Sequence, residues 1–361
     1  QNTGTSEGQL LAGAAKIVIT DEQGEPANDP LYVKALVLKA GETTAVIITV
    51  DAVAIEEIGS IKRGYLDGVR AQLGEALGIK PAHVVINASH CHGRVCADVE
   101  ARTVQAVNEA CKEMVPVRAG TGTGHEDRVS ENRRLKLKNG KEADVRHAYA
   151  LPPDNEVVSL GPIDPEIGVL RLDRENGETL AVVYNFAVHP IVGVPSGLNT
   201  ADITGLASQV IEDQLNDGAV ALFIQGCTGD VNPIGYKDVH HPRGAEILGN
   251  LLGLSTLKAL KQISSNEVSP LRIVHETLTL PRQDLSDRIA SLEAEQTSQL
   301  ATLKGTSLNL DTFLPLIVKY RLSPEFPSYA SHRYLHEDQV DRSAILILSD
   351  SSLSASDSSS L

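Results

Sequence analysis

The strongest constraint on the fold is a set of short, almost continuously apolar segments, each followed at once by polar or glycine-rich sequence. These segments cover residues 45–50, 84–87, 180–186 and 220–224. Apolar runs of this length are typical of strands that are buried on both faces of a sheet. Helical periodicity at about 56–77 and 203–215 predicts helices that cover the sheet. The order of elements therefore predicts an α/β protein with a mixed, largely buried sheet and flanking helices.

The rest of the chain adds elements to this framework. Further strands are expected at 14–20, 31–38 and 167–172. The segment 135–141 alternates in polarity and contains the pair Asn139-Gly140, which predicts a β-hairpin. A charged helix is expected at about 285–303. Another helix is expected to bury the apolar residues that recur every three or four positions, namely Ile247, Leu251, Leu254, Leu257 and Leu260.

The charge balance limits the classes of partner. The chain has 32 Lys and Arg against 47 Asp and Glu, so its net charge is −15. This charge repels nucleic-acid phosphates and anionic membranes. No apolar run approaches the roughly 18 residues that span a bilayer. Neither a nucleic-acid partner nor stable membrane insertion is expected. The four cysteines include no C-x-x-C pair, so packing thiols such as Cys91 and Cys96, with at most one disulfide, are expected.

Histidines follow two of the predicted strands. His90 and His92 are two residues apart, which places both imidazoles on one face if the backbone is extended. His189 follows the strand at 180–186 and precedes Pro190, which favours an extended conformation. Parallel strands would bring these side chains to one edge of the sheet, where neutral imidazoles can bind Zn²⁺. The pattern predicts either a zinc site at the carboxyl ends of the strands or histidines that only pack there.

Several polar residues allow both a structural and a functional interpretation. Residues 226–233 are typical of a tight loop, whose backbone N–H groups could also bind an oxyanion. Asp51 and Asp202 could cap elements, or could orient a histidine. Arg133 could belong to a solvated charge cluster, or could bind a carbonyl or carboxylate oxygen of a ligand.

In this order, the segments resemble the N-terminal catalytic domain of the neutral/alkaline ceramidase family. The resemblance covers about residues 10–260. It is carried by Thr49-Val50-Asp51, Ala88-Ser89-His90-Cys91-His92, Asn132-Arg133, Asn185-Phe186-Ala187-Val188-His189-Pro190, Ala201-Asp202 and Gln225-Gly226-Cys227-Thr228-Gly229-Asp230-Val231-Asn232-Pro233.

The resemblance implies a set of roles for these residues. His90 and His189 would bind Zn²⁺, and His92 and Arg133 would contact the amide region of the substrate. Asp230 and Asn232 are further candidate catalytic residues, and Gly229 is a candidate substrate-binding residue. The implied reaction is hydrolysis of an amide bond in a small-molecule or lipid N-acyl substrate. The resemblance also implies a role in lipid metabolism and a secreted or periplasmic location, while the sequence itself leaves a cytoplasmic location open.

Two departures from the family pattern shape the predicted mechanism. Asn232 stands where the family has a serine, and an amide side chain cannot act as a nucleophile. We therefore expect direct attack by a metal-activated water, with Asn232 as a hydrogen-bond donor. The family's glutamate ligand in a P-G-E-like motif and its later tyrosine ligand have no counterpart that the motifs identify. The sequence motifs therefore do not identify the remaining metal ligands.

The sequence thus predicts a ceramidase-like zinc hydrolase with its catalytic domain at 10–265. Residues 266–350 are expected to extend this domain or to form a helical lid. Residues 351–361, of which seven are serine, are expected to form a disordered tail. Two alternatives remain: a non-catalytic lipid- or glycan-binding protein on the same scaffold, and a metal-dependent esterase or phosphoesterase.

Overall fold

A computed structural model describes residues 8–21, 27–56, 58–144, 152, 154–193, 198–215, 218–236, 243–268, 271–279, 284–303 and 339–347. The chain forms two compact units. The first comprises residues 1–131, 162–275 and 343–361, and the second comprises 132–161 and 276–342. The predicted serine-rich tail lies outside the described residues.

The first unit is built on an eight-stranded sheet with the order β12-β11-β10-β5-β1-β2-β3-β4. Its strands are β1 (Leu11–Val18), β2 (Tyr32–Ala40), β3 (Thr43–Val50), β4 (Val84–Ala88), β5 (Val115–His125), β10 (Glu166–Arg174), β11 (Thr179–Phe186) and β12 (Val220–Gln225). Only the pairs β3–β4 and β11–β12 are parallel; the other neighbours are antiparallel. The predicted mixed sheet is confirmed.

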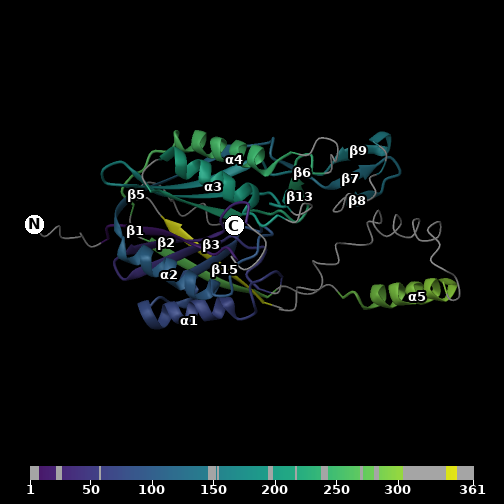
Figure 1. Ribbon diagram of the computed structural model, residues 1–361, viewed down its shortest axis with the longest axis horizontal. Coiled ribbons are helices and arrows are strands. Elements are labelled where there is room, and N and C mark those ends of the chain that lie inside the picture. Colours follow the sequence, from purple (N-terminus) through teal and green to yellow (C-terminus); the bar gives the residue numbers. More distant parts are fainter. Residues whose placement is uncertain are drawn as a thin grey trace, which may run out of the picture. The chain divides into compact units, whose positions relative to one another are not determined.

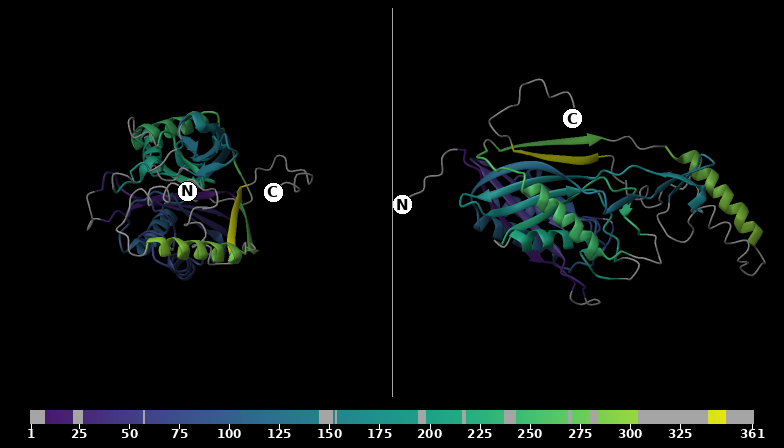
Figure 2. Two further views of the ribbon diagram at one scale, coloured as in Figure 1. Left: turned by 90° about the vertical axis from the view of Figure 1, so that its right-hand side faces the viewer. Right: turned by 90° about the horizontal axis from the view of Figure 1, so that it is seen from above.

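Helices cover the two halves of this sheet on opposite sides (Figures 1 and 2). We call β1–β4 the N-terminal half-sheet and β10–β12 the C-terminal half-sheet. Helices α1 (Tyr65–Leu77) and α2 (Val99–Lys112) lie outside the first, and α3 (Asp202–Leu215) and α4 (Ala245–Leu260) lie outside the second. Strand β5 joins the halves, because it starts beside β1 and continues beside β10.

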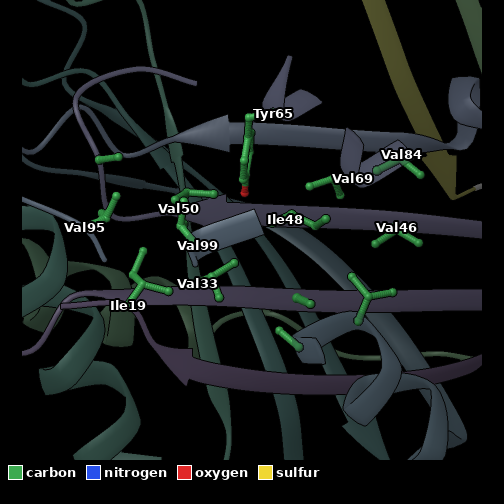
Figure 3. Packing of buried hydrophobic residues seen from close by; sticks show 14 of the residues in the cluster. Ile19, Val33, Val46, Ile48, Val50, Tyr65, Val69, Val84, Val95 and Val99 are labelled. Carbon is green, nitrogen blue, oxygen red and sulfur yellow. The ribbon is translucent and has the colours of Figure 1, made fainter. Parts of the chain in front are cut away.

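The core follows from the two-residue period of the strands. In β2, Val33, Ala35 and Val37 pack toward α1 and α2, whereas Leu36 and Leu38 belong to a different cluster. Figure 3 shows the first of these clusters, in which the Tyr65 hydroxyl lies 2.6 Å from that of Thr103. The second cluster contains residues from both half-sheets. Both faces of these strands are therefore buried, which explains why their sequences are continuous apolar runs.

A polar row interrupts this apolar interior. Lys34, Thr49 and Asn87 are cross-strand neighbours on β2, β3 and β4. Lys34 Nζ donates to Ala221 O at 2.9 Å, and Thr49 Oγ1 and Asn87 Nδ2 both donate to Phe223 O, at 2.8 and 3.0 Å. We call these contacts the polar seam. They satisfy backbone groups of β12, which has its hydrogen-bonded neighbour in the sheet on one side only.

Helix α4 differs from the prediction in the face that it buries. Ile247 and Leu254 are 57% and 56% exposed, while Leu248 and Leu252 are fully buried. The reason is close packing on α3: a Cβ at Gly253 would lie 2.9 Å from Ala207 O and 2.8 Å from the Cβ of Val210. The buried face of α4 contains its glycines, which a prediction based on the spacing of apolar side chains does not count.

Strand β5 was not predicted, because its sequence alternates glycine with small polar residues. Gly120, Gly122 and Gly124 lie against the end of α4 and the turn after it. A Cβ at Gly120 would lie 2.4 Å from Ser264 O, and one at Gly124 would lie 2.9 Å from the Cβ of Ala259. Side chains at these positions would keep the strand from this close approach.

The remaining elements are smaller. In the second unit, β7 (Arg134–Leu137) pairs with β8 (Glu142–Asp144) and β9 (Val157–Leu160), so the predicted hairpin is confirmed. Helix α5 (Ser286–Leu303) matches the predicted charged helix. The other short elements are η1 (Pro81–His83), η2 (Asp154–Glu156), the paired strands β6 (Ser130–Asn132) and β13 (Val231–Pro233), and the paired strands β14 (Leu271–Thr279) and β15 (Gln339–Ile347). Within the described residues, no helix is both long and apolar enough to span a membrane.

Candidate functional site

His90 follows β4 and is held by the backbone that leaves β3. Its N–H donates to Ala52 O at 3.0 Å, and its Nδ1 lies 2.6 Å from Val53 O. The residue has φ 67°, in the left-handed region that non-glycine residues rarely adopt. The extended backbone that would place both imidazoles on one face is therefore not present at His90. The neighbouring hydrogen bonds stabilise this conformation, which costs of the order of 1–3 kcal/mol.

His189 follows β11 and is held in a similar way by a different strand. Both its N–H and its Nδ1 contact Val231 O of β13, at 3.0 and 3.1 Å. The residue is 9% exposed. The loop that follows β12 thus fixes the imidazole at the end of β11.

The structure brings the three candidate histidines together. The ring centroids of His90 and His189 are 4.7 Å apart with an interplanar angle of 75°, and those of His90 and His92 are 5.5 Å apart at 77°. His92 is exposed and His90 half-buried. Strand β4, which precedes His90, is at one end of the strand order, and β11, which precedes His189, is second from the other end. The histidines meet because the two half-sheets face each other, and not because the strands are neighbours in one parallel sheet.

The hydrogen bonds of His90 and His189 define which ring nitrogen can bind a metal. A carbonyl oxygen only accepts, so each Nδ1 carries a proton, and in the neutral imidazole the lone pair is then on Nε2. Backbone carbonyls commonly orient zinc-binding histidines in this way. The two imidazoles therefore fit Zn²⁺ as Nε2 ligands. In the described part of the chain, no group of three or more His, Cys, Asp or Glu side chains could hold a metal.

Asn232 lies on β13, one residue after the carbonyl that holds His189. It is 1% exposed, and neither its Oδ1 nor its Nδ2 has a hydrogen-bond partner among the described residues. Leaving a buried amide without partners costs about 1–3 kcal/mol, so such a group needs an explanation. Gly229 and Asp230 lie in the turn just before β13, where Val231 N donates to Thr228 O at 3.0 Å.

The two candidate aspartates have structural contacts. Asp51 Oδ2 accepts from Tyr32 N at 2.9 Å, and burial raises the pKa of this carboxyl to about 6, with Lys34 opposing the shift. Asp202 Oδ2 accepts from Gly193 N and its Oδ1 accepts from Ile203 N, both at 2.8 Å. Asp202 therefore joins the loop after His189 to the start of α3. Burial also raises its pKa.

The remaining candidates lie as follows. Arg133 belongs to the second unit and is 5% exposed. Its neighbour Asn132 accepts from Arg134 N at 2.8 Å through Oδ1. All four cysteines are free thiols. Cys91 is buried in the core as expected, and burial raises the pKa of its thiol, whereas Cys227 is exposed.

One residue near the histidines had no role in the sequence-based prediction. Gln225, the last residue of β12, donates from Nε2 to Ser89 O at 3.0 Å and to Val188 O at 3.1 Å. These carbonyls immediately precede His90 and His189. Nothing in the sequence separates this glutamine from the loop that follows it, because its two partners are more than thirty residues away along the chain.

Comparison with known proteins places the fold. No protein-family model matches the sequence, and no curated protein matches it. Solved structures do match, and two of them are ceramidases. The neutral ceramidase from Pseudomonas aeruginosa is 17% identical with a TM-score of 0.63 and covers 95% of this chain. A ceramidase complexed with C2 is 19% identical with a TM-score of 0.61 and covers 76% of this chain. The chain has a ceramidase-like fold. It spans 61% and 47% of the length of these two proteins.

Proposed function

We propose that this protein is a ceramidase-like, zinc-dependent hydrolase that cleaves the amide bond of an N-acyl substrate, with a lipid as the expected class. The observation that carries the proposal is the contact between the imidazoles of His90 and His189, whose centroids are 4.7 Å apart while each Nδ1 faces a backbone carbonyl. The likeness of the fold to two ceramidases supports the choice of reaction.

The chain supplies metal ligands and orienting groups. His90 and His189 would hold Zn²⁺ through Nε2, and His92 would contact the amide region of the substrate from its exposed position. Bound zinc would polarise the scissile carbonyl and promote ionisation of the attacking water. Asn232 Nδ2 is a buried donor that can bind the oxygen on which negative charge develops. Gly229 and Asp230, in the turn before β13, would contact the substrate.

Metal content is the direct test of this proposal. We expect about one zinc per chain in the purified parent, measured by elemental mass spectrometry. The double variant His90→Ala/His189→Ala should lose it. His83→Ala is a matched control, because His83 is half-buried, its Nδ1 lies 2.9 Å from Thr44 O, and it precedes the opposite end of β4. Retention of zinc in the double variant would contradict the proposal.

Activity assays test the reaction class. The parent should hydrolyse a fluorogenic N-acyl amide. The double variant should not hydrolyse it, and Asn232→Ala should hydrolyse it more slowly than the parent. Loss of one oxyanion donor typically lowers kcat by about 10²–10³-fold. Preferential cleavage of esters or phosphoesters would shift the function to those classes. Trapping a covalent acyl-enzyme would contradict direct attack by water.

A second candidate function is a binding protein for lipids or glycans. The observation that favours it is that the described residues contain no set of three or more metal-ligating side chains, whereas catalytic zinc sites have three protein ligands. A parent protein that takes up no zinc, yet binds an N-acyl lipid in a fluorescence titration, would favour this candidate.

A further inference from the structure

The two segments that carry His90 and His189 are each fixed to their own half of the first unit. Ser89 N and His90 N donate to Val50 O and Ala52 O, which follow from β3. His189 N donates to Val231 O of β13. These bonds set the orientation of each histidine but leave the distance between the two histidine segments to other contacts.

The side chain of Gln225 bridges this distance. Its Nε2 donates one hydrogen bond to Ser89 O and one to Val188 O, at 3.0 and 3.1 Å. An amide nitrogen has two protons, so these bonds use both. Its Oε1 accepts from Gly226 N at 3.1 Å. The orientation of the amide is therefore determined by its partners, since the opposite assignment would place an oxygen against two carbonyls.

The backbone of Gln225 is fixed as well. Gln225 N donates to Asn87 Oδ1 at 3.1 Å, and Asn87 Nδ2 donates to Phe223 O at 3.0 Å. This reciprocal pair is the last contact of the polar seam, and it holds β12 beside β4. The amide of Gln225 thus starts from a fixed backbone and ends on the two residues that precede His90 and His189.

We propose that Gln225 is a positioning residue that sets the separation of the His90 and His189 imidazoles by clamping Ser89 and Val188 through one amide. The importance of Gln225 for metal binding and catalysis rests on the proposed function. The two hydrogen bonds of the clamp do not depend on that function. Gln225 acts on the histidines through the backbone. Second-sphere partners of metal ligands typically change metal affinity by about 10–100-fold when removed.

The test uses Gln225→Met, which keeps the length of the side chain and removes both donors. Thr49→Val is the matched control, because it removes a hydrogen bond to Phe223 O from the same seam and leaves the histidine segments alone. With histidine isotopically labelled, the metal-free parent should show nuclear Overhauser effects between the rings of His90 and His189. We expect these to be retained in Thr49→Val and to fall below about half their intensity in Gln225→Met, although both lose thermal stability.

Cobalt titration followed by visible absorption supplies the second measurement. The affinity for Co²⁺ should fall about 10–100-fold in Gln225→Met and stay within about threefold of the parent in Thr49→Val. Parental ring-to-ring effects in Gln225→Met, or their absence in the parent, would overturn the clamp. If the parent binds no Co²⁺, the zinc hydrolase fails, whereas the ring contacts still decide the clamp. Should Gln225→Met not fold, Gln225→Asn, which is too short to reach both carbonyls, is judged by the same criterion.

Discussion

The N-terminal and C-terminal half-sheets deliver one histidine each, by opposite routes. Each contains one parallel strand pair, β3–β4 or β11–β12. In the first, His90 follows the second strand of the pair and is held by Val53 O from the segment after the first strand. In the second, His189 follows the first strand and is held by Val231 O from the segment after the second strand.

The two routes differ in backbone strain. His90 has a φ of 67°, while His189 is not among the described non-glycine residues with positive φ. Each route also has a buried carboxyl whose pKa is raised by burial: Asp51 follows β3 in the first, and Asp202 holds the loop after His189 in the second. In the first route the left-handed conformation lies at the histidine itself, whereas in the second it lies at Asp202, which holds the loop after His189.

The largest expected effect concerns the polar seam that joins the half-sheets. Lys34 is 5% exposed and its Nζ lies 2.8 Å from Glu212 Oε1. Lys34→Met should lower the free energy of unfolding by about 3 kcal/mol, because it leaves a buried carboxylate with less compensation. Lys16→Met removes the more exposed partner of the same glutamate and should cost less than about 1 kcal/mol. Urea unfolding measures both, and equal losses would refute the role of burial.

The second prediction concerns Asp51, the buried carboxyl of the N-terminal route. Because its folded pKa of about 6 lies above the ordinary aspartate value of 3.8, the folded state binds the proton more tightly, and this stabilisation is lost as the pH rises from about 4 to above 6. The stability of Asp51→Asn relative to the parent should therefore increase over this range by about 2–3 kcal/mol. Denaturation at a series of pH values measures it. A constant difference would show that the carboxyl titrates normally.

The helices of the two halves provide a matched pair of glycines. Gly253→Ala in α4 should destabilise the protein by about 2 kcal/mol, because the new Cβ meets backbone at Ala207 O. In α1, a Cβ at Gly68 would meet only the flexible carboxylate of Glu100, at 2.5 Å from Oε1. Gly68→Ala should be neutral or stabilise by up to about 1 kcal/mol through helix propensity. Thermal unfolding distinguishes them, and a loss of similar size in both would contradict this difference in packing.

The smallest effect probes the strain at His90 directly. Alanine has no advantage over glycine at φ 67°, so His90→Gly should equal or exceed His90→Ala in stability, by up to about 1 kcal/mol. At His189 the order should be reversed, with His189→Gly less stable than His189→Ala by about 0.5–1 kcal/mol. Denaturant unfolding of the four variants gives the comparison. The same order at both sites would mean that the two routes do not differ in strain.

Much of the fold could be predicted because apolar periodicity is a local signal. The strands at 180–186 and 220–224 and the helix at 203–215 were predicted within a residue or two of β11, β12 and α3. The same signal failed where small residues carry the packing. Strand β5 was missed. Of the five residues on the predicted face of α4, Leu260 is buried and Leu251 and Leu257 are partly buried, but Ile247 and Leu254 are exposed and Leu248 and Leu252 are buried instead.

The candidate site was predictable in part. His90, His92 and His189 were chosen from their places at the ends of strands, and the structure brings their rings together. The reason given for their meeting was incomplete, because it assumed parallel neighbours. Gln225 was quoted within a motif without a function, since its partners at Ser89 and Val188 become visible only when the half-sheets face each other.

The amino-acid sequence was enough to predict the mixed α/β class, most strands and helices, and the histidines at the ends of two strands. Backbone propensity and side-chain periodicity act over a few residues, so they can be read along the chain. Which imidazoles meet, which of their nitrogens face backbone carbonyls, and which amide links their segments are set by the tertiary structure alone. Those features depend on contacts between Lys34, Thr49, Asn87 and the edge of β12, which join segments more than a hundred residues apart.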